Sequence, residues 1–543
     1  VDSRDVRFVL FEALDADKLN KYPKFADFDK DTFEATLDLA EQIAIEQIYP
    51  TADLGDKEGG CKYDPQTKKV TIPPCYKPVL DAYYQAGLFG LSDEAEHGGS
   101  GMPVVINSAV MEYMCAANYP LGMYPGLSHG AMELIAVFGT EEQKHTYIPK
   151  MMTGEWGGTM CLTEPEAGSD VGALKTKAVP QPDGTYKITG QKCFITNGDQ
   201  DITRQIIYPV LARIEGDPPG VKGISIFIVP KYLVNEDGSL GERNDVFCTG
   251  LEHKMGAHGA ATCSMSFGEN ENCTGYLLGE RGRGMNIMFQ MLNETRLEVG
   301  IMGLGGSSAA LQFAVDYART RLQGVHFSKM FETNAPKVPI IEHPDVTRML
   351  MGMKALVEGQ RMLSYYAAMQ IDLAKLLEGE ESREARSLVD VLIPLVKAGN
   401  AENTWHITAE AIQVHGGYGY CSEYPVEQLA VDCKSLSIVE GTNGIQSLDL
   451  VMRKILLNAD QKNYKVLKSR IFQTIEKANG IVEDVYRNML LTGLERMDST
   501  LETMKKNMDE GRYHTLLLNV DPVRRAFFDL MLGWMHLWCL ALV

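Results

Sequence analysis

Apolar side chains recur at helical spacing through the early part of the chain. Between residues 31 and 50 they occupy Phe33, Leu37, Leu39, Ile43, Ile45 and Ile48. This run predicts a helix that stops at Pro50, because proline interrupts helical hydrogen bonding. Further helices are expected around residues 77–86, 107–117, 130–138 and 141–152. Together they predict an N-terminal helical domain over 31–156, preceded by an extension of residues 1–30.

The pattern changes at Trp156, where short apolar runs are broken by Pro, Gly and Asp. These runs lie at residues 157–162, 186–196, 206–214, 223–229 and 262–267. Short, β-branched runs between turn residues are typical of strands, so a small, mostly antiparallel β domain is expected over 157–284. The glycines of residues 279–284 read as a linker, because their spacing and context do not match a dinucleotide-binding turn.

Long helical patterns return after Met285. They run over residues 285–321, 345–377 and 385–415, and a last one runs from 445 to about 458. Four helices joined by modest loops predict an antiparallel bundle over 285–459. Residues 460–543 add more helical sequence, and the apolar stretch 530–543 is expected to form one buried helix. The fold class is therefore a multidomain α and β chain.

Composition narrows the function to a small-molecule enzyme. At 543 residues the chain is long enough for three or four domains, and 45% hydrophobic with 23% charged residues is ordinary for a globular protein. The formal charge of −20 repels phosphate backbones and anionic lipid, so no nucleic-acid partner is expected. Since no run of ~20 apolar residues occurs, no stable membrane insertion is expected either.

The cysteines and the chain start bear on location. Eleven scattered cysteines without zinc spacing predict reduced thiols and no metal site. The start at Val1 carries no secretory signal, which makes the cytoplasm the expected location. Because the sequence begins without Met and stops inside an apolar helix, both ends are expected to be incomplete.

Four segments carry the chemistry. Residues 437–446 read Ser-Ile-Val-Glu-Gly-Thr-Asn-Gly-Ile-Gln, which by residue type alone is a helix start with Thr442 as N-cap. Upstream lie Met-Cys-Leu-Thr-Glu-Pro-Glu-Ala-Gly-Ser-Asp at 160–170, Phe-Ile-Thr-Asn-Gly at 194–198 and Ala-Ile-Gln-Val-His-Gly-Gly-Tyr-Gly at 411–419. In this order, over roughly residues 80 to 460, they closely resemble the acyl-CoA dehydrogenase family of flavoenzymes.

The resemblance implies a fold and a reaction. It implies a helical N-terminal domain, a small β-barrel-like domain, a four-helix bundle and an added C-terminal extension. FAD would be the cofactor and an acyl-CoA the substrate, with Glu440 as the base that removes the α proton. The β hydrogen would pass as hydride to flavin N5, leaving trans-2-enoyl-CoA, and electron-transfer flavoprotein or a similar acceptor would take the electrons. Apolar Ile438 and Val439 are expected to raise the pKa of Glu440 by burial.

The resemblance also implies binding residues. Cofactor positions fall on Cys161, Leu162, Thr163, Gly168, Ser169, Phe194, Thr196, Arg321, Gln413, Gly417 and Thr442. The hydroxyls of Thr163 and Thr196 would bond the flavin ring, and Phe194 would back it. Arg321, Gln413 and Gly417 would contact the ADP half of a flavin that reaches a neighbouring subunit. Substrate positions fall on Ser169, Arg296 and Gly441.

Two departures and two open assignments accompany the resemblance. Arg321 opens Arg-Leu-Gln-Gly where the family has Arg-x-x-Phe-Gly, so the adenine pocket is expected to differ, and Gly444 replaces a polar side chain. Some members take the base from the position before Arg296; here it is Thr295, and Glu294 lies about 100° round the helix. Arg296 would anchor the thioester or CoA, or pair with Glu294. His415 is expected to be a packing residue.

Two other functions and one assembly remain open. An acyl-CoA oxidase using oxygen is the neighbouring alternative, and a non-dehydrogenating, DNA-associated relative of the same fold is the second, disfavoured by the negative charge. The flanking segments 1–30 and 460–543 resemble those of longer bacterial dehydrogenases, the type that includes 3-methylthiopropanoyl-CoA dehydrogenase. A homodimer is expected, stabilised by residues 460–543 packing on the bundle.

Overall fold

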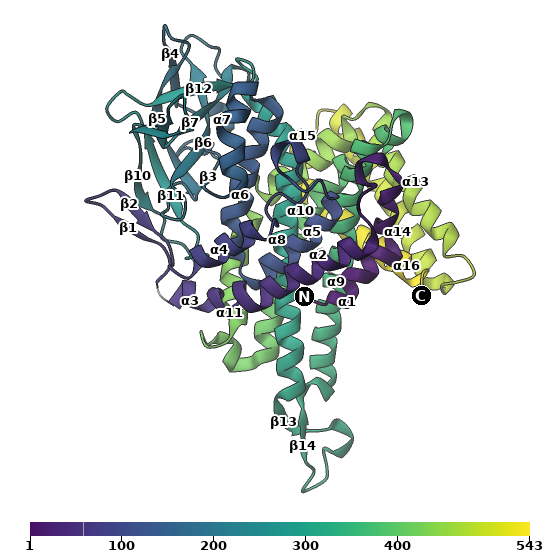
Figure 1. Cartoon of the computed structure of the whole chain (residues 1–543). Helices are drawn as coiled ribbons and strands as arrows, with labels where there is room; N and C mark the ends of the chain where they lie inside the picture. Colours follow the sequence, from purple (N-terminus) through teal and green to yellow (C-terminus); the bar gives the residue numbers. More distant parts are fainter. Residues whose placement is uncertain (58) are drawn as a thin grey trace. The chain divides into compact units, whose positions relative to one another are not determined.

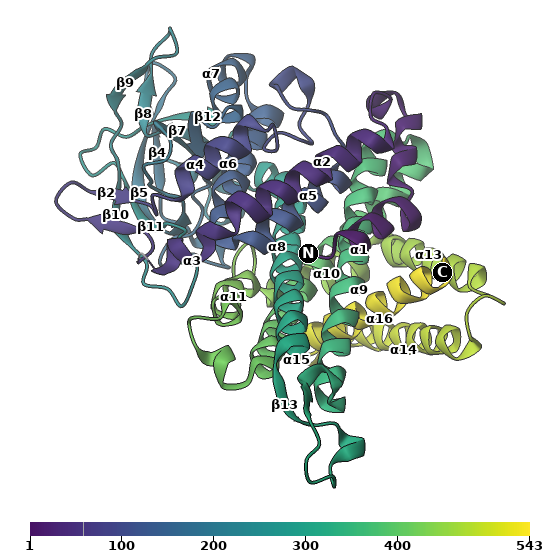
Figure 2. The same ribbon diagram turned by 60° about the horizontal axis from the view of Figure 1, so that its bottom comes forward.

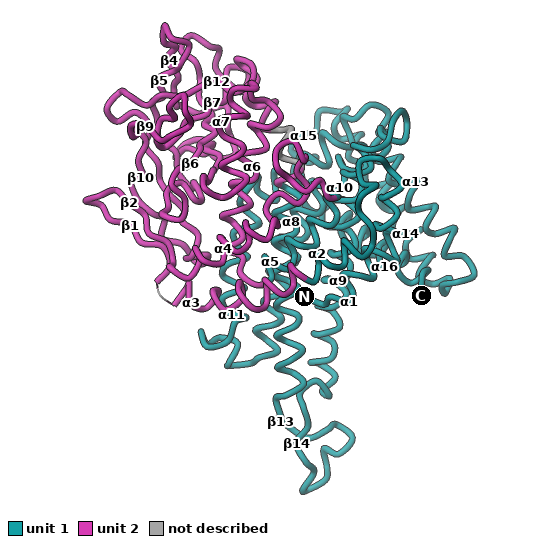
Figure 3. Tube along the Cα trace, in the orientation of Figure 1, with its two compact units in different colours: residues 1–38, 103–116, 296–543 teal, residues 39–102, 117–295 magenta. Residues whose placement is uncertain are grey.

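The computed structural model describes residues 1–57 and 59–543, without the side chains of residues 289–293. The chain divides into two compact units, each described here by itself (Figure 3). Unit 1 holds residues 1–38, 103–116 and 296–543, and unit 2 holds residues 39–102 and 117–295.

Unit 2 is built on an eight-stranded sheet with strand order β10-β11-β5-β12-β7-β6-β3, in which β4 pairs with both β5 and β6. The strands are β3 (Trp156–Gly158), β4 (Lys177–Pro180), β5 (Tyr186–Thr196), β6 (Gln205–Ile214), β7 (Ile224–Pro230), β10 (Val246–Leu251), β11 (Thr262–Phe267) and β12 (Thr274–Leu278). The pairs β5–β12, β12–β7, β7–β6, β6–β4 and β4–β5 close a ring. The expected barrel-like domain is therefore confirmed, and only the pairs that join β3 and β4 to β6 are parallel.

Helices and short hairpins complete unit 2, where α6 and α7 pack on the edge of the sheet (Figure 1). These elements are α3 (Pro50–Lys57), α4 (Tyr76–Gln85), α6 (Tyr119–Phe138), α7 (Glu141–Met152), β1 (Lys62–Asp64), β2 (Lys69–Thr71), β8 (Tyr232–Val234) and β9 (Leu240–Arg243). Two expectations were wrong. Pro50 does not end helical structure but opens α3, and α6 begins well before residue 130 because Pro120 sits in its first turn, where no amide hydrogen bond is lost.

The bundle of unit 1 has the four expected helices. They are α8 (Gly284–Thr320, in this unit from residue 296), α9 (Pro344–Leu376), α10 (Gly379–His415) and α12 (Asn443–Leu448), which continues as the π-helix η12 (Asp449–Leu456). α8 meets α10 closely, since a Cβ on Gly300 would lie 2.5 Å from the Val396 side chain. A hairpin of β13 (Leu322–Val325) and β14 (Lys337–Pro339) extends beyond the ends of α8 and α9 (Figure 1). The sequence pattern missed α11 (Pro425–Cys433).

The C-terminal segment packs on the bundle, as expected. It forms α13 (Lys462–Lys477), α14 (Asp484–Asp509), α15 (Tyr513–Leu518) and α16 (Val520–Leu540). Figure 2 shows α16 beside α9 and α14, and its Phe528 ring fills the space over Gly399 of α10. Trp534 is fully buried and its Nε1 donates to Thr474 Oγ1 at 2.8 Å. The buried part of this segment begins earlier than residue 530, and Val543 is exposed.

Three findings bear on chemistry. No disulfide joins the eleven cysteines, all of which lie among the described residues. Among the described residues, no three His, Cys, Asp or Glu side chains gather as a metal site. In the same part of the chain, each helix is too short or too polar to cross a bilayer.

Candidate active site

Two of the sequence segments meet at β5 of unit 2. The main-chain nitrogen of Cys193 donates to the oxygen of Thr163 at 3.0 Å. The Nζ of Lys192 donates to the oxygen of Leu162 at 2.9 Å. The structure therefore brings Leu162 and Thr163 beside the strand that carries Phe194 and Thr196, although some 30 residues separate them in sequence.

A buried ion pair holds this junction. Glu164 Oε1 accepts from Lys192 Nζ at 2.8 Å, and the side chains are 6% and 0% exposed. Glu164 also accepts from Thr176 Oγ1 and from the main chain of residues 175 and 176. Burial opposes ionisation of Glu164, but Lys192 and these hydrogen bonds bring its pKa below the ordinary value. Burial lowers the pKa of Lys192, with Glu164 acting in the opposite direction.

The surface beside this pair suits a flat, largely apolar ring. Phe194 is 64% exposed and adopts a φ of 56°, which a non-glycine residue rarely does. Thr196 follows two positions later on β5 and is partly exposed. A Cβ on Gly168 would meet nothing within 4 Å, and Ser169 is exposed. An exposed aromatic ring, nearby hydroxyls and an open glycine turn fit a flavin.

Cys161 is the exception among the expected cofactor residues. Its side chain is fully buried in the sheet core, and its main chain pairs with Pro209 and Leu211 of β6. This burial leaves no surface of Cys161 for a ligand, so its assignment as a direct contact is not supported by the structure. Its role is to anchor the start of the 161–170 segment to the sheet.

In unit 1, Glu440 lies in a tight loop before α12. Its φ is 51°, and that of Gly441 is 86°. The φ of Gly441 favours glycine there, and a Cβ would also come within 2.7 Å of Gln446 Nε2. Thr442 caps α12 by accepting from the nitrogen of Ile445 at 3.3 Å, as the residue pattern predicted.

The electrostatics of Glu440 suit a base. Burial raises its pKa, while the nearby cations of Lys397 and Arg296 act to lower it. Of the two apolar neighbours expected to bury it, Ile438 is 60% exposed and Val439 is partly buried. Glu440 is itself partly exposed, and it lies in the loop that Lys397 of α10 holds through the main-chain oxygens of Leu436 and Gly441.

Arg296 is buried and pairs with a residue that the sequence did not suggest. Its Nη1 donates to Asp449 Oδ2 at 3.0 Å, with side-chain exposures of 6% and 8%. Its Nε is buried without a hydrogen-bond partner in the described part of the chain. Asp449 is thus an ion partner of Arg296. The unpaired Nε is a donor that a bound group could use.

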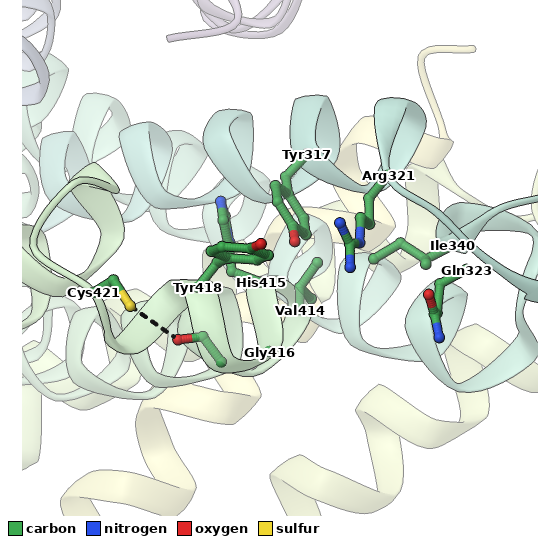
Figure 4. A pocket seen from close by; sticks show the side chains of 10 residues that line it. Tyr317, Arg321, Gln323, Ile340, Val414, His415, Gly416, Tyr418 and Cys421 are labelled. Carbon is green, nitrogen blue, oxygen red and sulfur yellow. Dashed lines mark hydrogen bonds between the residues drawn. The ribbon is translucent and has the colours of Figure 1, made fainter.

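A cavity of about 410 Å³ lies at the end of α8 and α10. Figure 4 shows Tyr317 of α8 and Arg321, which directly follows that helix, pointing toward His415 and Tyr418. The guanidinium carbon of Arg321 lies 5.4 Å from the centre of the Tyr418 ring. Gly417 lines the cavity, and a Cβ there would meet nothing within 4 Å. The cavity therefore offers a cation, aromatic faces and open glycine backbone.

His415 packs in this wall, as expected. Its ring stacks on Tyr317 with centroids 4.3 Å apart, its Nδ1 contacts the oxygen of Ala411 at 2.8 Å, and burial lowers its pKa. Gln413, two positions earlier, is exposed and is not part of the cavity lining. The structure thus gathers Arg321 and Gly417 at one cavity and places Gln413 beside its lining residue Gly416, whose nitrogen donates to the oxygen of Gln413.

Sequence reasoning missed the buried polar residues that support the site. Lys192, Lys397 and Asp449 each hold a candidate site segment in place. Lys397 lies in α10 directly after an unbroken apolar run, residues 391–396. The residues on either side of it in this helix are buried. A lone lysine in such a run was the available signal.

Comparison with known proteins identifies the family. Three family models match: acyl-CoA dehydrogenase N-terminal domain over residues 31–155, middle domain over 159–269 and C-terminal domain over 282–456. A butyryl-CoA dehydrogenase of Syntrophomonas wolfei is 41% identical over 463 residues, which is 84% of this chain and 75% of that protein. A 3-methylmercaptopropionyl-CoA dehydrogenase of Ruegeria pomeroyi is 39% identical over 454 residues, 83% of this chain and 76% of that protein.

The fold comparison extends over the added segments. An acyl-CoA dehydrogenase of Bacillus anthracis, solved in complex with FAD, matches with a TM-score of 0.74 at 22% identity. It covers 98% of this chain, and the chain covers 84% of it. The likeness therefore includes the C-terminal helices, which lie outside the family models. Because three domain models of this family match the chain and its relatives are 39–41% identical over most of its length, the chain belongs to the acyl-CoA dehydrogenase family of oxidoreductases.

Proposed function

We propose that the protein is an FAD-dependent acyl-CoA dehydrogenase in which Glu440 removes the α proton of the acyl thioester. The observation that carries the proposal is the state of Glu440. It is a carboxylate with a raised pKa, set in a strained loop beside Arg296, in a chain of this family. A general base works best when its pKa approaches the working pH, and burial moves a carboxylate in that direction.

The reaction divides into a proton step and a hydride step. An acyl thioester is a weak carbon acid, so its α proton leaves only to a base held at the right place. Glu440 takes that proton on its carboxylate, and the cation of Arg296 favours negative charge that develops nearby. FAD, when bound, supplies the acceptor for the β hydrogen as hydride at N5, so that trans-2-enoyl-CoA is formed.

Several residues are proposed to hold FAD. In unit 2 the proposed contacts come from β5 and from the turn beside it. They are Leu162, Thr163, Gly168, Ser169, Phe194 and Thr196. The exposure of Phe194 supports this, because a ring that is 64% exposed on a left-handed backbone leaves a face free for a ligand. Thr442 is proposed as a pyrophosphate contact, while Ser169, Arg296 and Gly441 are proposed to contact the substrate.

We further propose a homodimer. The cavity lined by Arg321 and Gly417 would receive the ADP half of the FAD held by a second copy, and Gln413 would lie at its edge. Its cation and aromatic faces support this, because a diphosphate and an adenine ring need those two chemistries. The division at residues 30, 156, 284 and 459 and the cytoplasmic location stay predictions.

The relatives suggest where to look for the substrate. One is named for butyryl-CoA and the other for 3-methylmercaptopropionyl-CoA, both short, unbranched acyl chains. We therefore propose a short, unbranched acyl-CoA as substrate and electron-transfer flavoprotein as electron acceptor.

A panel of acyl-CoA thioesters tests the function. The purified protein should be yellow, and anaerobic addition of butyryl-CoA should bleach its flavin absorbance more strongly than palmitoyl-CoA. Free CoA serves as the control. Turnover with a dye under argon, without matching peroxide release in air, is expected for a dehydrogenase. Peroxide equal to product in air would make the protein an oxidase, and failure to bind FAD would refute the proposal.

A further inference from the structure

A lysine lies fully buried in the middle of α10. Lys397 is 0% exposed, and its Nζ donates to the main-chain oxygens of Leu436 at 2.8 Å and Gly441 at 2.7 Å. Removing an amine from water is costly, and an apolar side chain would fill the same space without that cost. Both hydrogen bonds go to the loop that carries Glu440, which points to a function in that loop.

The two accepting oxygens lie on either side of Glu440 in the chain. Leu436 is the buried residue of η11 (Lys434–Ser437), four positions before Glu440. Gly441 follows Glu440 directly. Between them, Glu440 adopts its left-handed backbone conformation, which needs support from its surroundings. Gln446 Nε2 also contacts the oxygen of Glu440, at 3.2 Å, but it belongs to the same segment. Lys397 ties both sides of this loop to the long α10, and just after the loop Asn443 Nδ2 donates to the oxygen of Ala398 in the same helix at 3.3 Å.

We propose that Lys397 is the positioning residue of the catalytic base: its amine fixes the main chain on both sides of Glu440 and so directs the carboxylate. This inference rests on the proposed function, in which Glu440 is the base. It extends that function by naming a residue that touches neither substrate nor cofactor and acts through the loop.

Charge supports the same role. Burial lowers the pKa of Lys397 to about 7, with Glu440 acting to raise it and Arg296 to lower it. Three charged groups therefore influence one another here: Arg296 from α8, Lys397 from α10 and Glu440 from the loop. A neutral amine still has two N–H donors, so the loop stays held above pH 7. Below pH 7 the protonated amine also lowers the pKa of Glu440, which keeps the base ionised at lower pH.

Lys397→Met tests the proposal, because methionine keeps the length and loses the donors. In the FAD-loaded protein, hydrogen–deuterium exchange by mass spectrometry should show faster amide exchange in peptides covering residues 436–446, and unchanged exchange in the β domain. The second readout is solvent deuterium exchange at the α carbon of phenylacetyl-CoA, which has α protons but no β hydrogen to lose. A base displaced by about 1 Å should lose about 100-fold in rate.

Two further readouts separate positioning from general damage. The Kd for phenylacetyl-CoA should change by less than about threefold, since the binding residues are untouched. The acid limb of the pH–rate profile should move to higher pH, because a cation beside Glu440 has been removed. Lys434→Met is the matched control: it begins the same loop, and its Nζ lies 5.2 Å from the centre of the Trp405 ring. It should leave both exchange measurements at wild-type values.

Each outcome decides between positioning and packing. Wild-type amide exchange in residues 436–446, or a wild-type α-exchange rate, in Lys397→Met would overturn the proposal. So would a lower rate with an unmoved pH profile. If Lys397→Met does not fold, Lys397→Gln, which keeps a shorter donor, is used instead. Its amide exchange in residues 436–446 and its α-exchange rate should lie between those expected for Lys397→Met and the wild-type values, and wild-type values in both would overturn the proposal. Glu440→Gln separates the two claims. Wild-type α exchange in that variant would refute Glu440 as the base, whereas amide exchange in residues 436–446 of Lys397→Met would still test whether Lys397 holds the loop.

Discussion

The ion pair between Glu164 and Lys192 gives a sharp test of how the expected flavin surface is supported. Lys192→Met removes the donor to Leu162, Glu164 and Leu211 and leaves a carboxylate that is 6% exposed. Removing one partner of a buried pair costs about 3–5 kcal/mol, because the remaining charge is uncompensated. For a cooperative unit of 150–250 residues this lowers the unfolding midpoint by on the order of 10 °C.

The assay is thermal unfolding of the FAD-loaded protein, followed through the release of flavin fluorescence. Midpoints are compared, since a two-state free energy is not defined for a chain of several domains. Lys175→Met is the control: Lys175 pairs with Glu166, and because those side chains are 72% and 74% exposed, solvent screens the pair and the midpoint should stay close to the wild-type value. The double variant Lys192→Met/Glu164→Gln should recover part of the loss, because no charge is left buried.

The pH dependence has a definite sign. In wild type the pKa of Glu164 is lowered, so its contribution to stability is present above the usual value of 4.5 and is lost as the pH falls below it. In Lys192→Met that pKa rises, and acid relieves the penalty by protonating the carboxylate. The gap between the two midpoints should therefore narrow as the pH approaches 4.5. A variant as stable as Lys175→Met at pH 7 would refute the reasoning.

Two further predictions concern assembly and pH. Light scattering on a size-exclusion column should give twice the chain mass of 60.1 kDa, with α16 covering part of the bundle; a stable tetramer would contradict this. The rate of flavin reduction by substrate should rise with pH along a limb that lies above pH 4.5, because only ionised Glu440 accepts the proton and burial raises its pKa. A limb at or below pH 4.5, measured by stopped flow with constant ionic strength, would contradict the raised pKa of Glu440 and its role as the base.

Local sequence signals located the regular elements. The expected strand bounds 186–196 and 262–267 coincide with β5 and β11, and the helix at 141–152 coincides with α7. α7 carries a capping box between Thr140 and Gln143, which fixes its start in the sequence itself. The start of α6 was missed because Pro and Gly, which usually mark loops, are tolerated there in the first turns.

The site was predictable only where its residues form contiguous motifs. Glu440 and Thr163 lie in such motifs, whereas Lys192, Lys397 and Asp449 act through partners that are distant in sequence. No spacing rule reveals that a lysine in α10 will donate to the oxygen of Gly441. The exposure of Ile438 was likewise unpredictable, because it depends on the left-handed turn at Glu440.

The most direct test of the account is flavin bleaching by butyryl-CoA in Glu440→Gln. The amide keeps the shape of the carboxylate but is not basic, so FAD content and acyl-CoA binding should stay at wild-type values. Anaerobic stopped flow should then show the rate of bleaching reduced by at least ~10²–10⁴-fold, as expected for loss of a general base. Bleaching at the wild-type rate would contradict the account and move the base elsewhere, with Glu294 the next residue to replace.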